Sequence, residues 1–223
     1  MNLSDKVERA RKCIRTATRR IAIERVAVAW TGGKDSTVLL HIIRELHGGL
    51  VPYPVFFNDS TFEFPDIYRF INRLTKAWRL RLVRVKHLQP DLEVFSKLSE
   101  ERKLEFSRIM KINTLHWALS KYGWRAFLVA IRRDEHPSRK KEVYVSSRGD
   151  HLRIHPLLDF TEKDIWEYIR AHRVPVVSLY KRGYRSLGEM PFTRKSSAKG
   201  GERSGREPGK ELMMEELRRM GYW

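Results

Sequence analysis

The sequence predicts an α/β protein with a doubly wound, mainly parallel sheet. Short apolar runs alternate along the chain with longer segments in which apolar residues recur every three or four positions, as in strands that alternate with helices. The run at 126–131 is apolar throughout, which is typical of a strand buried on both faces. With 223 residues, the chain is long enough for one such domain and too short for two large ones.

The first half of the chain has a regular order of expected elements. Gly48 and Gly49 form a helix stop signal, Pro65 can occupy the first turn of a helix, and Gly123 ends another helical segment. Strands are therefore expected at 26–30, 52–57, 80–85 and 126–131, and helices at 2–23, 37–46, 65–78 and 92–122.

The second half is less regular. Candidate strands at 143–147 and 152–158 precede a helix whose N-terminus is capped by Thr161. From 182 to 210 the composition turns to Gly, Ser, Lys and Arg, and helical spacing returns only at 212–220. We therefore expect a domain over 1–188 and a flexible basic tail over 189–223 that ends in a short helix.

Charge and cysteine content narrow the class of protein. The 45 Lys and Arg against 27 Asp and Glu give a formal charge of +18, which favours anionic partners such as nucleotides, sulfate or nucleic acid without choosing among them. The single Gln89 and single Cys13 fit a heat-adapted composition. One cysteine excludes a disulfide within the chain, and Cys13 is expected to be half-buried beside the apolar stripe of the first helix. Because no apolar run reaches the length of a membrane span, we expect a cytoplasmic protein without a membrane partner.

The segment between the first strand and the second helix predicts a phosphate site. It reads Thr31-Gly32-Gly33-Lys34-Asp35-Ser36. Two glycines let the backbone approach a phosphate, and the first N–H groups and the dipole of the following helix favour an anion at the same place. It is not a Walker loop, because Val28 stands where the first Gly is required and Asp35 follows Lys34.

Polar residues follow two other expected strands. Asn58-Asp59-Ser60 ends the second strand, where a turn with a helix cap and a ligand contact are equally good readings. Arg132 and Arg133 follow the strand at 126–131, and Arg139 comes shortly after. Ligands bind beyond the carboxyl ends of strands in doubly wound sheets, so we expect these arginines to bind phosphate or sulfate.

These motifs resemble a known family. The hexapeptide 31–36 is similar to the Ser-Gly-Gly-x-Asp-Ser pyrophosphate loop of ATP pyrophosphatases, with Thr31 in place of the first Ser. Nearly the whole chain resembles the small subunit of sulfate adenylyltransferase, within the phosphoadenosine phosphosulfate (PAPS) reductase family. The segments that carry the resemblance are 109–111, 119–123, 132–135, 138–139, 156–157, Trp166, 179–180, 183–188 and the tail motif Glu202-Arg203-Ser204-Gly205-Arg206.

The resemblance implies a five-stranded Rossmann-like sheet that binds ATP. Gly32, Gly33, Lys34, Asp35 and Ser36 would hold the phosphates together with Thr31, and Asp59 would lie near the adenosine. The acceptor anion, sulfate in the first place, would face Arg132, Arg133 and Arg139 and be covered by Arg203 and Arg206.

The resemblance further implies a GTPase large subunit as partner, while the sequence leaves the oligomeric state open. No His, Asp and Glu cluster has the spacing of a metal site, so Mg²⁺ is expected to arrive with ATP.

The chain departs from the reductases of this family. Those enzymes carry a C-terminal catalytic Cys or cysteine ligands of an iron-sulfur cluster, whereas here Glu189-Met190-Pro191-Phe192 follows Gly188 and no Cys occurs downstream. Adenylyl transfer needs no protein nucleophile, only positioning and charge neutralisation. The sequence thus favours an adenylyltransferase acting on sulfate. Transfer to flavin mononucleotide (FMN), reduction with another thiol source, and nucleic-acid binding or modification remain as alternatives.

Overall fold

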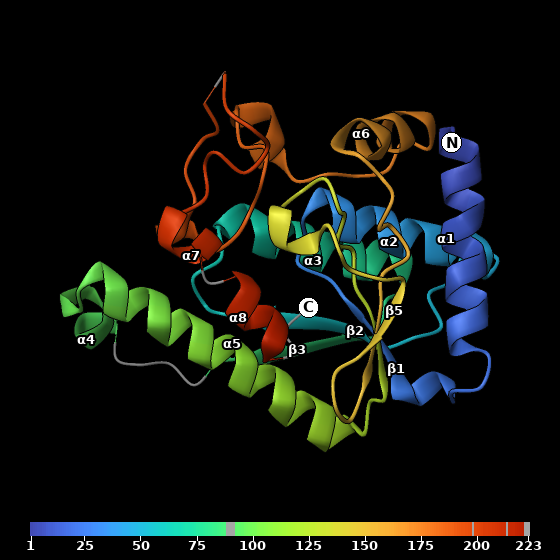
Figure 1. The fold of residues 1–223 in the computed structure, drawn as a ribbon, viewed down its shortest axis with the longest axis horizontal. Coiled ribbons are helices and arrows are strands. Elements are labelled where there is room, and N and C mark those ends of the chain that lie inside the picture. Colours follow the sequence, from blue (N-terminus) through green and yellow to red (C-terminus); the bar gives the residue numbers. More distant parts are fainter. Residues whose placement is uncertain (88–91, 198, 213, 221–223) are drawn as a thin grey trace.

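A six-stranded, mainly parallel sheet forms the centre of the molecule. The computed structural model describes residues 1–87, 92–197, 199–212 and 214–220 (Figure 1). The strands lie in the order β3-β2-β1-β4-β6-β5, and only β5 runs antiparallel to its neighbour. Their bounds are β1 Val26–Ala29, β2 Val55–Asp59, β3 Leu82–Lys86, β4 Ala126–Leu128, β5 Val145–Ser147 and β6 Leu152–Ile154.

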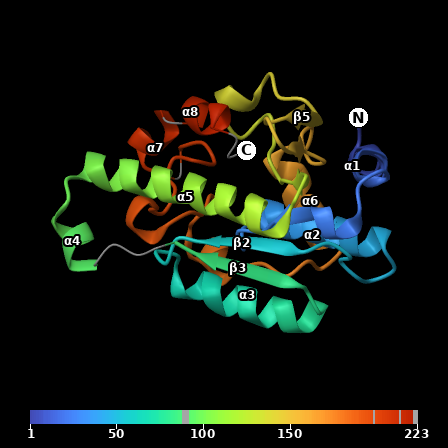
Figure 2. The same ribbon diagram turned by 90° about the horizontal axis from the view of Figure 1, so that it is seen from below.

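Helices cover both faces of this sheet, as expected for doubly wound topology. On one face, α1, α2, α3 and α6 bury their apolar stripes against residues such as Val28, Phe57 and Ile154. On the other, α5 packs Leu115 and Leu119 against alternate strand positions. Figure 2 shows β2 and β3 between α3 and α5. The helices are α1 Leu3–Thr18, α2 Lys34–Leu46, α3 Pro65–Trp78, α4 Leu92–Lys97, α5 Glu100–Tyr122, α6 Glu162–Ala171, α7 Pro208–Leu212 and α8 Met214–Arg219.

The parallel order of elements and the six candidate strands are confirmed, and the five strands implied by the family resemblance are corrected to six. The additional strand arises because residues 148–151 form a tight turn, in which Arg148 N–H donates to His151 O at 2.9 Å, and fold β5 back on β6. The single helix expected over 92–122 is two helices, since the side chain of Ser99 caps a new N-terminus by accepting from Arg102 N–H at 3.4 Å.

The segment after Gly188 folds back over the sheet. Thr193 pairs with Arg206 in an antiparallel bridge, and Arg194 N–H donates to Gly205 O at 2.8 Å, which closes a hairpin that we call the tail hairpin, residues 193–206 without the undescribed 198. Beyond it, α7 and α8 lie beside α5 (Figure 1), where Arg108 of α5 pairs with Glu216. The tail therefore has a defined course, and its assignment as a separate unit stays a prediction.

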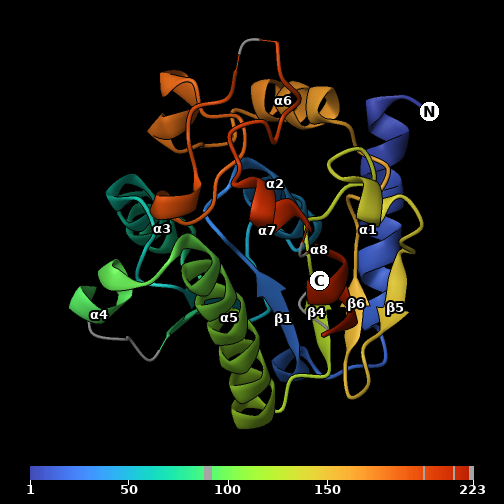
Figure 3. The ribbon, with the colours of Figure 1, turned by 60° about the vertical axis from the view of Figure 1, so that its left-hand side comes forward.

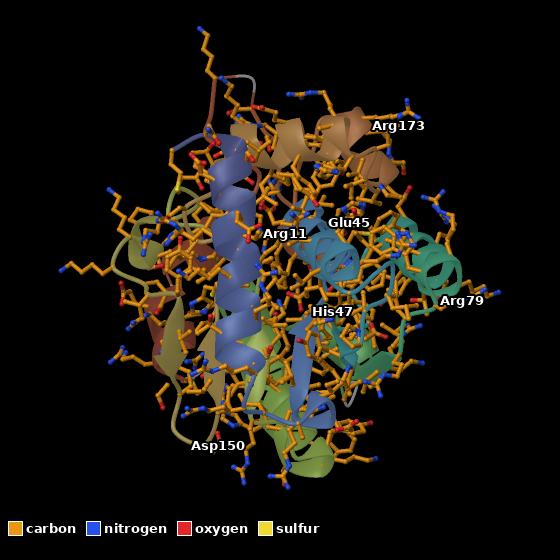
Figure 4. The ribbon with its side chains drawn as sticks, turned by 90° about the vertical axis from the view of Figure 1, so that its right-hand side faces the viewer. Arg11, Glu45, His47, Arg79, Asp150 and Arg173 are labelled. Atoms are coloured by element: carbon orange, nitrogen blue, oxygen red, sulfur yellow. The ribbon has the colours of Figure 1, made fainter. Side chains whose placement is uncertain are left out.

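The outer surface is rich in charge. Figure 4 shows the face crossed by α1, where Arg79 and Arg173 reach into solvent beyond the apolar core. Within the described ranges, no helix combines the length and the apolar character that a membrane crossing requires.

Candidate functional site

The turn between β1 and α2 is held by its own side chains. Gly32 has φ 74°, and a Cβ there would lie 3.2 Å from Ile67, so the position requires glycine. The hydroxyls of Thr31 and Ser36 lie 3.1 Å apart, Ser36 Oγ donates to Gly33 O at 3.1 Å, and Gly33 N–H donates to Thr31 Oγ1 at 3.3 Å. Gly33 is the N-cap of α2, so the helix N-terminus is presented in one conformation.

A cavity of about 270 Å³ opens at this turn and runs between the sheet, α5 and the tail. Its polar end includes Thr31, Gly33, Lys34, Asp35 and Ser36. Apolar residues of the sheet, of α5 and of α8 also line the cavity, beside the charged Arg108, Lys111 and Arg153, so residues far apart in sequence share one enclosure. The apolar wall includes Leu104, Leu115, Phe127, Ile131, Met214 and Leu217.

Beneath the turn lies a cluster of five charges, of which Lys34 and Arg132 are buried. Lys34 Nζ pairs with Glu202 and lies 3.3 Å from Asp35 Oδ2. Arg132, which is fully buried, pairs with Glu202, places Nε 2.7 Å from Asp35 Oδ1 and Nη1 2.8 Å from Asp134 Oδ1. We call Lys34, Asp35, Arg132, Asp134 and Glu202 the loop charge cluster.

Burial and the nearby charges together shift the pKa values of Lys34 and Glu202. Burial alone would lower the pKa of Lys34, but the nearby carboxylates raise it, so the ammonium stays charged. Burial raises the pKa of Glu202, and the neighbouring Lys34 only partly opposes that effect.

Three further arginines meet at the cavity from two parts of the chain. Arg139 and Arg203 both pair with Glu135, and Arg203 also donates to Glu211 at 2.6 and 2.7 Å. Arg206 lies over Gly188, where a Cβ would come within 2.4 Å of its guanidinium nitrogens. Burial lowers the pKa of Arg206, so this guanidinium gains from an anionic neighbour.

The remaining expected site residues lie outside the cavity lining. Arg133 donates to Glu142 O at 2.9 Å and pairs with Asp159, so its guanidinium is directed away from Arg132. Asp59 is fully buried and accepts from Arg84 Nε at 2.6 Å and Tyr68 Oη at 2.7 Å. Its neighbour Asn58 lines the cavity in its place. Arg132 also does not line the cavity and contacts the turn through the loop charge cluster.

The structure adds site residues that sequence reasoning assigned no role. Tyr180 Oη accepts from Lys34 N–H at 2.7 Å and orders the first turn of α2. Glu189 is buried, accepts from Ser107 Oγ at 2.7 Å and lies 2.9 Å from Lys111 Nζ. Tyr180, Lys111 and Glu202 lie in segments that carried the family resemblance, and that was the only signal available. Among the described residues, no group of His, Cys, Asp and Glu is arranged to hold a metal ion.

Comparisons with known proteins identify the family of the chain. The phosphoadenosine phosphosulfate reductase domain model matches residues 25–195. Sulfate adenylyltransferase subunit 2 of Ectopseudomonas mendocina is 32% identical over 192 residues, covering 72% of this chain and 61% of the relative. Phosphoadenosine 5′-phosphosulfate reductase of Alkalilimnicola ehrlichii is 29% identical over 177 residues, covering 77% and 71%. The chain thus spans about six tenths of the length of the sulfate adenylyltransferase relatives.

Solved structures show the same fold. The PAPS reductase of Candida auris superposes with a TM-score of 0.69 at 19% identity, covering 82% of this chain and 88% of that one. The FMN adenylyltransferase of Candida glabrata has a TM-score of 0.69 at 18% identity, covering 87% and 66%. Both likenesses concern the fold alone. With the domain match spanning most of its length, the chain belongs to the phosphoadenosine phosphosulfate reductase domain family.

Proposed function

We propose that this chain is an ATP-dependent adenylyltransferase that converts ATP and sulfate into adenylyl sulfate and pyrophosphate. The observation that carries the proposal is the single cavity that joins the turn at the N-terminus of α2 to Arg139, Arg203 and Arg206. A helix N-terminus suits the phosphates of ATP, and arginine forks suit a second anion. The 32% identity to sulfate adenylyltransferase subunit 2 supports the same choice.

The reaction asks for positioning and charge neutralisation. A sulfate oxygen attacks the α-phosphorus of ATP and forms the new P–O bond, while the bond from the α-phosphorus to the bridging oxygen breaks and its electron pair leaves with pyrophosphate. The dipole at the N-terminus of α2 would attract the phosphates, and the N–H groups of Gly33 and Lys34 would exchange their present acceptors, Thr31 Oγ1 and Tyr180 Oη, for phosphate oxygens. Arg139, Arg203 and Arg206 would hold sulfate against the α-phosphorus. Mg²⁺ bound to ATP would add charge neutralisation at the phosphates.

The apolar wall of the cavity gives the adenine ring a suitable place. Phe127, Leu115 and Ile131 supply apolar surface there, and Asn58, whose amide contacts Lys111 O and His87, lines the same cavity. Nucleotide sites commonly combine an apolar slot with few polar groups that fix orientation. We therefore propose that adenine packs on this wall and that the triphosphate extends towards Lys34.

Thiol chemistry is disfavoured by where the cysteine lies. Cys13 is in α1, packs beside the core on the α2 face, and does not line the cavity. Burial raises the pKa of its thiol to about 11, which leaves little thiolate at neutral pH. Next to Gly188 the cavity instead holds the carboxylate of Glu189. These residues support adenylyl transfer over reduction.

The test is pyrophosphate release from ATP and Mg²⁺ in parallel reactions with sulfate, FMN and RNA, each with and without a GTPase large subunit from a relative. We expect release that depends on sulfate, and at least a tenfold loss in Arg206→Gln because a charge-assisted contact to the anion is removed. Arg20→Gln, which changes an exposed arginine, is the matched control. Release that depends only on FMN, or no turnover with any acceptor, would overturn the proposal.

A further inference from the structure

The tail places a carboxylate in the anion position of the turn. One oxygen of Glu202 accepts from Lys34 Nζ and the other from Arg132 Nη2. Glu202 lies on the tail hairpin, 168 residues from Lys34, and its side chain is 9% exposed. Figure 3 shows the tail passing in front of α2. The two cations nearest the N-terminus of α2 are thus already bound to an anion of the protein.

Lys34 is enclosed by protein acceptors in this arrangement. Its ammonium donates to Glu202 and to Arg185 O at 3.0 Å and lies 3.3 Å from Asp35 Oδ2, and its side chain is 1% exposed. A phosphate can bind this ammonium only if one partner leaves. Asp35 belongs to the first turn of α2. Glu202 follows Gly200 and Gly201 and can move with the hairpin, so it is the partner best able to leave.

The net charge of the loop charge cluster also favours the departure of Glu202. Lys34 and Arg132 face three carboxylates, those of Asp35, Asp134 and Glu202, so the loop charge cluster carries one more negative than positive charge. Removing Glu202 makes the cluster neutral. A polyphosphate approaching the turn is then no longer repelled by a net negative charge.

We propose that Glu202 is a displaceable internal anion: it occupies Lys34 and Arg132 in the free protein, and a nucleotide polyphosphate takes its place and releases the tail hairpin from the turn. This rests on the proposed function and names how its nucleotide site is regulated. Nucleotide binding and the position of Arg203 and Arg206 are thereby coupled, because these arginines follow Glu202 on the same hairpin.

The first experiment compares inorganic pyrophosphate binding by calorimetry in the wild type, Glu202→Gln and Glu215→Gln. Glu215 is an exposed tail glutamate, so both variants change the net charge equally. We expect Glu202→Gln to bind about tenfold more tightly, because the competing carboxylate is gone, and Glu215→Gln to match the wild type. Equal or weaker binding by folded Glu202→Gln would overturn the inference.

The second experiment uses only the wild-type protein and so does not depend on how a variant folds. Trypsin cleavage after Lys195 and Arg203 is followed with and without pyrophosphate. Displacement of Glu202 predicts faster cleavage when pyrophosphate is bound, whereas unchanged or slower cleavage overturns the inference and leaves the proposed function standing. If the wild type binds neither pyrophosphate nor ATP, both are overturned.

Discussion

A methyl group at residue 205 would open the tail hairpin where Gly205 faces Arg194. An ideal Cβ on Gly205 lies 2.2 Å from the carbonyl oxygen of Arg194 and 3.1 Å from its carbonyl carbon. The obstacle is backbone, which a change of rotamer cannot remove. Because the same two residues are joined by the 2.8 Å hydrogen bond from Arg194 N–H to Gly205 O, relief of the contact must strain or break that bond.

The cost follows from the geometry. Ordinary contact requires the two backbones to separate by about 1 Å, which takes the hydrogen bond beyond its normal range of lengths. One lost hydrogen bond contributes about 1 kcal/mol and overpacking typically 1–3 kcal/mol, so we expect the hairpin to be destabilised by about 2 kcal/mol in Gly205→Ala. That corresponds to a roughly 30-fold larger population of the open hairpin.

Limited trypsin digestion measures this population, since cleavage of a transiently opened segment follows its opening equilibrium when closing is fast. We expect cleavage after Arg194 and Lys195 to be roughly 30-fold faster in Gly205→Ala than in the wild type. Gly201→Ala is the matched control, because nothing lies within 4 Å of a Cβ there. Equal cleavage rates in the two variants would refute the hairpin geometry.

Three more predictions concern the turn, the cysteine and a buried histidine. Gly33→Val places a branched side chain beside Thr31 Oγ1, which lies 3.2 Å from the Cβ position. Calorimetry should then show ATP binding weakened at least tenfold, while thermal unfolding of the variant stays cooperative. An unchanged ATP affinity would contradict the assignment of the phosphate site to this turn. Since burial raises the pKa of Cys13 to about 11, iodoacetamide at pH 8 should alkylate this thiol roughly a hundredfold more slowly than a free cysteine. Rapid labelling of the folded protein would argue against this burial. The Cys13→Ala variant should keep full turnover. Burial lowers the pKa of His155 to about 4, while Val143 O accepts from its Nδ1–H at 2.8 Å and its Nε2 has no hydrogen-bond partner among the described residues. As the pH falls, the unfolded state therefore takes up the proton first, so the free energy of unfolding present above about pH 6.5 should decrease by up to about 3 kcal/mol towards pH 4. Chemical denaturation at a series of pH values should show a flatter dependence of this free energy on pH in His155→Asn. Parallel pH dependences in the variant and the wild type would contradict the lowered pKa of His155.

Much of the fold could be predicted because its signals are local. The strand, glycine turn and helix at 26–46 follow from the period of apolar residues and from the conformational freedom of Gly32, whose φ is 74° in the structure. The helix start at Pro65 and the end at Gly123 were likewise marked by single residues. The break at Ser99 was missed because the predicted helix rested on the apolar spacing of 109–119, whereas the new N-terminus is marked by the capping hydroxyl of Ser99 and by Glu100 and Glu101 in the first turn.

The candidate site likewise combines features that neighbouring residues encode with features that depend on the fold of the whole chain. By itself, the sequence determined the glycine turn at 31–36, the parallel order of the elements and the family, because each depends on neighbouring residues or on a contiguous motif. Only the tertiary structure decided that Arg132 turns inward to the loop charge cluster while the adjacent Arg133 pairs with Asp159, and that Glu202 reaches Lys34 across 168 residues. Such ion pairs are set by the path of the whole chain, and Coulombic attraction depends on distance in space, which no local pattern of residues encodes.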